Sequence, residues 1–163
     1  MAKGTEIVVS SQHRGVEQEC IVSGTPKPGT VMQIKAATEP VGGAYTYEAY
    51  DKSYDAMPDA VAVLLPDRYQ GKLETEAYTS GDRGFIYFPA AGEELNMIIE
   101  NVAGTADDYA IGDRLEINDG TGKLQDASTS TLNNRRAPFT VLETITDPTD
   151  DYLAHVRFNG HGG

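Results

Sequence analysis

The chain has 163 residues, with 13 lysines and arginines against 25 aspartates and glutamates, and a formal net charge of −12 at pH 7. This acidity counts against nucleic-acid binding, which depends on neutralising phosphate charge. Cys20 is the only cysteine, so an internal disulfide or a thiolate metal cluster is excluded. The N-terminus lacks an apolar run of signal-peptide length and no 18-residue apolar stretch occurs. We therefore expect a protein made in the cytosol and not inserted in a membrane.

Glycine, proline and tyrosine indicate the fold class. The chain has 17 glycines, 8 prolines and 9 tyrosines. Glycine supplies the positive φ angles of tight turns, and tyrosine favours the pleated, half-buried surface of a sheet. No amphipathic pattern of helical length competes with short strands. We predict an all-β protein with a small β-barrel or β-sandwich-like body and an extended N-terminal arm.

Residues 1–29 are predicted to form this arm. Two short β-prone segments, Glu6–Val9 and Cys20–Val22, alternate with turn-forming stretches at 10–15 and 24–29. Strands isolated in this way have exposed edges unless they pair with the body or with a neighbouring subunit. The predicted intersubunit contacts of the arm are Ile7, Val8, Val9, Ile21 and Val22.

Residues 30–163 are predicted to form the body. Alternation predicts a first strand at 30–35, and the apolar run 60–65, which ends at Pro66, predicts a buried strand. Asp119-Gly120 is a favoured turn pair and predicts a hairpin. Further strands are predicted at 85–88, 95–102, 139–145 and 153–158.

The tripeptide Gly-Asp-Arg occurs twice, at 81–83 and at 112–114, each time before large apolar residues. The repetition predicts that the same turn opens two strands. Proline and glycine in 89–92 predict a corner after the first of these strands.

Four tyrosines, Tyr45, Tyr47, Tyr50 and Tyr54, lie among acidic and small residues. Two interpretations stay open: a surface loop whose tyrosines lie on the body, and a contact surface, since tyrosine is favoured at protein interfaces. Tyr45 and Tyr47 are candidate contacts to a partner or to a neighbouring subunit. The tyrosines could also stack on a carbohydrate or other ligand, although the absence of tryptophan counts against it.

The sequence contains no pattern that predicts catalysis. The stretch 120–123 lacks the upstream glycine and the following Ser or Thr of a phosphate-binding loop, which favours a hairpin turn. Cys20 lies in an apolar setting, where cysteine usually acts as a small hydrophobe. The acidic pairs 93–94, 107–108 and 150–151 lack the spacing of a calcium loop and are predicted to be solvated turns. We predict no enzyme activity, no cofactor and no metal site.

Arg135 and Arg136 form a basic pair in an acidic chain. They are either solvated in a polar loop or form ion pairs with an acidic neighbour, for which the planar guanidinium is suited. Both stay candidates for the contact surface.

The order of glycine turns and strands in the stretches 81–99, 111–124, 138–144 and 153–158 resembles that of the capsid cement (head decoration) proteins of tailed bacteriophages. The resemblance covers roughly residues 28–160. It implies a barrel-like body that binds the outside of an assembled capsid, commonly as trimers near local three-fold positions. It implies no catalytic residues.

The residues and the resemblance together predict a structural virion protein. It would stabilise the capsid by bridging neighbouring major capsid protein subunits through many weak contacts, which gain strength by acting together. The predicted partners are the major capsid protein and further copies of this chain, with no nucleic acid and no membrane. The alternative is a carbohydrate- or ligand-binding β-domain.

Overall fold

The computed structural model describes ten β-strands and their connections. The described residues are 7–8, 15–36, 38–51, 60–67, 73, 75–100, 108–118, 120–127, 137–148 and 151–160. The strands are β1 (Val16–Val22), β2 (Val31–Ile34), β3 (Thr46–Ala49), β4 (Ala62–Leu65), β5 (Arg83–Phe88), β6 (Glu94–Ile99), β7 (Arg114–Ile117), β8 (Leu124–Asp126), β9 (Phe139–Val141) and β10 (Tyr152–Phe158). Within these residues, no helix has the length and apolar character needed to cross a membrane.

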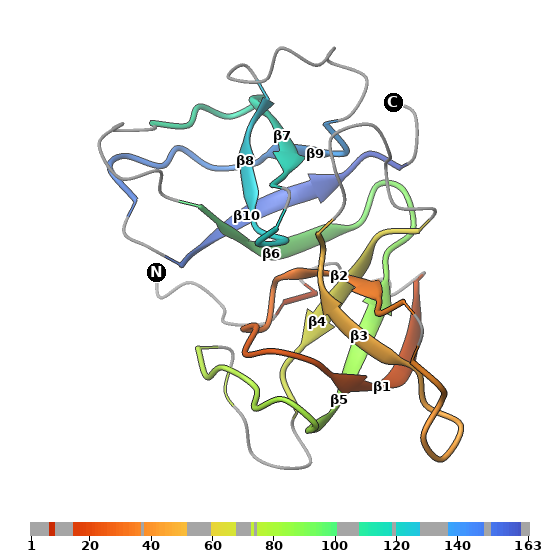
Figure 1. The fold of residues 1–163 in the computed structure, drawn as a ribbon. Helices are drawn as coiled ribbons and strands as arrows, with labels where there is room; N and C mark the ends of the chain where they lie inside the picture. Colours follow the sequence, from red (N-terminus) through yellow and green to blue (C-terminus); the bar gives the residue numbers. More distant parts are fainter. Residues whose placement is uncertain are drawn as a thin grey trace.

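The strands close into two small barrels that follow one another along the chain. The first barrel has the strand order β1-β3-β2-β4-β5, and the second has the order β10-β6-β8-β7-β9. In Figure 1 the second barrel lies above the first. The all-β fold and the barrel-like body are confirmed, but the single body predicted for residues 30–163 is in fact the larger part of one barrel and the whole of another.

The apolar core explains why the two barrels stay together. One buried cluster lies inside the first barrel and includes Cys20, Val22 and Met32. A larger cluster contains Val31 and Val63 from the first barrel together with most of the buried side chains of the second. Alternate residues of β4 and of the first half of β2 therefore point to opposite sides, and both sides are buried there. This is why the run 60–65 lacks polar residues.

The two barrels have the same connectivity. The pairs β1–β3 and β6–β8 are parallel, and the other pairs of neighbouring strands in each barrel are antiparallel. The registers also coincide. Equivalent pairs are Val22↔Tyr47 and Ile99↔Leu124, Met32↔Ala62 and Leu115↔Phe139, and Leu64↔Ile86 and Val141↔Val156. The chain is therefore a structural duplication, with β1 to β5 equivalent to β6 to β10.

Hydrogen bonds outside the ladders repeat as well. Gly29 N–H donates to the carbonyl of Leu64 at 2.8 Å, and Gly112 N–H donates to that of Val141 at 2.9 Å. A hydrogen bond between a glutamine and a glutamate also repeats, but the two residue types exchange strands. Gln33 Nε2 donates to Glu48 Oε1 at 3.2 Å in the first barrel, and Gln125 Nε2 donates to Glu116 Oε1 at 2.6 Å in the second.

The two Gly-Asp-Arg tripeptides form the same local turn but do not mark equivalent strands. Asp82 accepts a hydrogen bond from Thr79 N–H at 2.9 Å, and Asp113 accepts one from Ala110 N–H at 2.8 Å. The first turn precedes β5 and the second precedes β7, whose equivalent is β2. The prediction of a shared turn is confirmed. The two tripeptides are not equivalent positions of the duplicated barrels.

The predicted arm requires a correction. Residues 16–22 are not an arm, because β1 pairs with β5 over its length and closes the first barrel. Cys20 and Val22 are the inward-facing residues of that strand and are fully buried. Ile7 and Val8 form a short bridge to the edge of β6, where Asn96 N–H donates to the carbonyl of Ile7 at 2.7 Å. The rest of 1–14 lies outside the described residues.

Candidate functional site

The two barrels meet at a seam formed by residues 27–31 and 50 of the first barrel and residues 96–98 and 120–123 of the second. Backbone hydrogen bonds cross it: Val31 N–H donates to the carbonyl of Gly122 at 2.8 Å, and Gly120 N–H donates to that of Tyr50 at 3.1 Å. The turn between β7 and β8 thus lies directly against β2 and the end of β3. The predicted hairpin between β7 and β8 is confirmed, and it joins the barrels; Asp119 itself lies outside the described residues.

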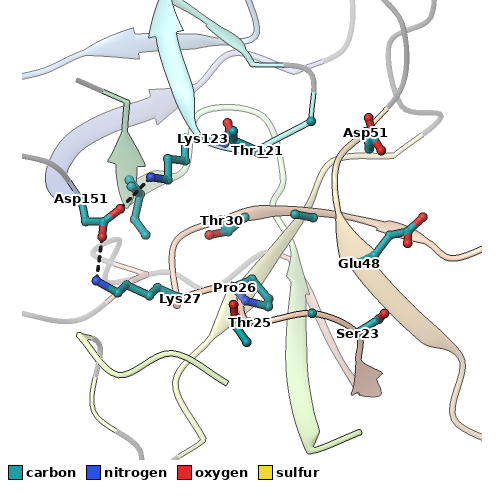
Figure 2. A pocket seen from close by; sticks show the side chains of 14 residues that line it. Ser23, Thr25, Pro26, Lys27, Thr30, Glu48, Asp51, Thr121, Lys123 and Asp151 are labelled. Carbon is teal, nitrogen blue, oxygen red and sulfur yellow. Dashed lines mark hydrogen bonds and ion pairs between the residues drawn. The ribbon is translucent and has the colours of Figure 1, made fainter. Parts of the chain in front are cut away.

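A pocket of about 440 Å³ opens beside the seam. Its lining comes from both barrels and is mostly polar, with Thr30, Glu48 and Asp51 from the first barrel and Thr121 from the second. Figure 2 shows Glu48 and Asp51 on one side of the pocket and two lysines on the other.

These lysines share one carboxylate. Lys27 Nζ lies 2.6 Å from Asp151 Oδ2, and Lys123 Nζ lies 2.8 Å from Asp151 Oδ1. Lys27 belongs to the first barrel and the other two residues to the second, so the ion pairs join the barrels (Figure 2). Hydrogen bonds from Lys123 and Lys27 hold the pKa of Asp151 below its ordinary value.

The backbone of Asp151 indicates that this carboxylate has a specific role. Its φ angle is 62°, a left-handed conformation that is unfavourable for a residue with a side chain. The register of β5 and β10 makes Gly81, with a φ of 95°, its equivalent in the first barrel. Aspartate thus occupies a glycine position, and we interpret it as a clamp between the barrels.

Replacing Asp151 with asparagine is expected to lower the free energy of unfolding at pH 7 by about 1–2 kcal/mol, because the two ion pairs are only partly exposed. The pKa of this carboxyl is lowered in the folded state, so its contribution is present above the unfolded pKa. It is lost as the pH falls through the folded pKa. The two proteins should therefore converge in urea titrations at acid pH.

Asp147 provides the matched control for this substitution. It also has a left-handed backbone, with a φ of 46°, but no ion pair joins it to another described residue. Asp147→Asn should leave stability nearly unchanged at both pH values. Equal losses in the two variants would contradict a clamp at Asp151.

The described residues offer little reactive chemistry. They contain no group of three His, Cys, Asp or Glu side chains that could hold a metal ion. Burial raises the pKa of Cys20 to about 12, so its thiol stays protonated at neutral pH. Burial and the hydrogen bond to Glu93 also raise the pKa of Tyr87 to about 12.

Several predicted contact residues are covered by their own chain. Ile7, Val22 and Tyr47 are 1%, 0% and 4% exposed, so the prediction that they contact a partner is wrong. All three side chains belong to the buried core clusters. Val8 and Ile21 are half-buried, and only Tyr45, at 44%, is largely exposed. Val9, Arg135 and Arg136 lie outside the described residues.

The tyrosines form no stacking surface among the described residues. Tyr47 and Tyr50 are both 4% exposed and belong to different core clusters, while Tyr45 lies on the surface. Tyr54 lies outside the described residues. The observed positions therefore do not favour the ligand-binding alternative.

The connection between β2 and β3 carries exposed apolar side chains, of which only Tyr45 was a predicted contact residue. We call Ile34, Val41 and Tyr45 the hairpin patch; their exposed fractions are 54%, 59% and 44%. Ile34 and Tyr45 flank the connection, and Val41 lies at its turn, where it bridges to Ala44. In Figure 1 this connection projects at the lower right, on the side away from the second barrel.

Comparison with known proteins gives a structural likeness only. No protein-family model matches the chain, and no curated protein matches it. The N base of the head fiber gp8.5 of bacteriophage phi29 is similar in structure, with a TM-score of 0.53 and 10% sequence identity. The match covers 88% of this chain and 93% of the other, and therefore takes in residues of both barrels. At this identity the likeness concerns the fold.

Proposed function

We propose that this protein is a structural component of a tailed-phage virion. It binds the outer surface of the assembled capsid and stabilises it by bridging neighbouring major capsid protein subunits. It acts without catalysis and without a cofactor, and further copies of the chain assemble with it, three at a time, at local three-fold positions.

The observation that carries this proposal is the likeness to the head fiber base over nearly the whole of both chains. That protein belongs to a phage head, and the order of turns and strands in this sequence independently resembles the cement proteins of phage heads. Two separate comparisons therefore support the same class of protein.

The surface of the chain suits a position on the outside of a particle. A net charge of −12 keeps particles that carry many copies from adhering to one another. Many identical contacts on one shell also make a modest single contact effective. The exposed hairpin patch, with Val9, Arg135 and Arg136, provides candidate contact residues.

Co-sedimentation tests the proposal. The purified protein is mixed with expanded capsids assembled without it, and the pelleted fraction is measured as the protein concentration increases. We expect saturable binding with a fixed ratio to the coat protein, and capsids that release their contents at a higher temperature. An unrelated acidic protein of similar size and charge is the control. Binding no greater than this control would contradict the proposal.

A further inference from the structure

The duplication makes it possible to compare each surface of one barrel with its equivalent in the other. The β7–β8 hairpin of the second barrel lies on the first barrel at the seam. Its equivalent, the β2–β3 hairpin, lies against no other barrel among the described residues. The side chains at its base show the same contrast. Ile117, in β7, is half-buried and packs against the shared core, whereas its equivalent Ile34 is 54% exposed.

The segment that leads into the receiving strand shows the opposite contrast. Gly29 and Gly112 are equivalent by their hydrogen bonds, which makes Pro28 and Ile111 equivalent to each other. Pro28 is part of the seam and is buried. Ile111 is 68% exposed, the largest value among the exposed large apolar residues of the described chain. The second barrel thus exposes an apolar residue where the first barrel is covered.

The chain makes one hairpin-to-barrel contact, at the seam. Ile34 and Ile111 lie where the two partners of a second, equivalent contact would be. We propose that the β2–β3 hairpin of one copy docks on the second barrel of another copy, near Ile111, in the way that the β7–β8 hairpin docks on the first barrel. The inference rests on the proposed self-association, for which it names the contacting surfaces, and it is independent of capsid binding.

The position of the two surfaces determines the type of assembly. In Figure 1 the β2–β3 connection projects at the lower right, whereas the segment that leads into β7 lies at the upper left. Different surfaces at opposite ends of the molecule give a head-to-tail contact, which forms a ring if the rotation closes and an open filament if it does not. A ring of three copies would contain six barrels in a pseudo-sixfold arrangement.

Charge does not oppose this contact at the hairpin itself. Residues 34–46 contain one cation, Lys35, and one anion, Glu39, so their formal net charge is zero in a chain of net charge −12. The remaining repulsion between acidic copies is screened by salt. We therefore expect self-association to strengthen as the salt concentration increases, as apolar contacts between like-charged proteins do.

Light scattering after size exclusion tests the proposal on the full chain. We expect a mass of several chains at high concentration, and the mass of a single chain, 17.6 kDa, for Ile34→Asp/Val41→Asp and for Ile111→Asp. The matched control is Val16→Asp/Leu73→Asp, which introduces the same charge at residues of similar exposure, 64% and 58%, outside both surfaces. This control should keep the wild-type mass.

Mixing the two defective variants provides a second measurement. In a head-to-tail contact, each variant keeps the surface that the other lacks, so the mixture should give a complex of two chains and nothing larger. A wild-type protein that stays a single chain up to about 0.5 mM, where even weak contacts are populated, would overturn the proposal. A hairpin variant with the wild-type mass would also overturn it. Wild-type chains that associate in this way but do not bind capsids would refute the proposed function and leave this inference standing.

Discussion

Replacing Gly122 with alanine is expected to lower the free energy of unfolding by about 4 kcal/mol and the melting temperature by about 10 °C. A Cβ atom at this position would lie 2.3 Å from the carbonyl oxygen of Val31 and 3.0 Å from the backbone N of Tyr50. Both neighbours are backbone atoms of the seam and cannot rotate away. The φ angle of 65° adds the strain of a left-handed residue. Differential scanning calorimetry measures the loss.

Gly81→Ala separates the strain from the contact. Gly81 also has a left-handed backbone, with a φ of 95°, but no atom lies within 4 Å of its added Cβ. This variant should lose only about 1–2 kcal/mol, the cost of the backbone conformation. If both variants lost a similar free energy of unfolding, the seam would accommodate the added methyl group without strain. That result would contradict the tight contact between the barrels.

Replacing Glu93 with alanine is expected to lower the free energy of unfolding by about 3 kcal/mol, because the buried Tyr87 hydroxyl and the partly buried Ala90 N–H lose their acceptor. Glu93 is 2% exposed. Its Oε1 accepts a hydrogen bond from Tyr87 Oη at 2.7 Å, and its Oε2 accepts one from Ala90 N–H at 2.7 Å. Urea titration at neutral pH measures the change.

The adjacent Glu94 is the control for this prediction. Its side chain is 35% exposed and lies 3.1 Å from His155 Nε2 and 3.3 Å from Arg157 Nη2. Partly exposed ion pairs contribute up to about 1 kcal/mol each, and the Arg157 side chain is half exposed, so Glu94→Ala should cost about 1 kcal/mol, clearly less than Glu93→Ala. If the two variants lose the same stability, Glu93 does not have the structural role that its contacts indicate.

The fold class could be predicted because its signals are local. Glycine turns, alternation and short apolar runs each depend on a few neighbouring residues. They predicted most of the strands and the hairpin between β7 and β8, but not β3, which was interpreted as a loop. The pair Glu93 and Glu94 shows where local signals end. Both were predicted to lie in a solvated turn, yet the corner between β5 and β6 turns the first carboxylate inward towards Tyr87. Sequence spacing alone does not distinguish the two.

The duplication could not be predicted, because it is conserved in register rather than in residues. Equivalent pairs such as Ala62 with Phe139 and Val31 with Arg114 have little in common as side chains. Ile34 and Val41 of the hairpin patch were missed for a related reason. Ile34 and Ile117 occupy the same place in β2 and β7, and only the position of the neighbouring barrel decides which of them is covered.

The barrels are continuous in the chain, 16–88 and 94–158, and this order has a consequence during synthesis on the ribosome. Once residue 88 has left the exit tunnel, every strand of the first barrel is available and that barrel can close. Val31, Tyr50 and Val63 then face solvent, because the cluster that covers them is still to be made. The nascent chain therefore passes through a stage with an exposed apolar surface. This surface can aggregate or bind chaperones until the second barrel folds onto it.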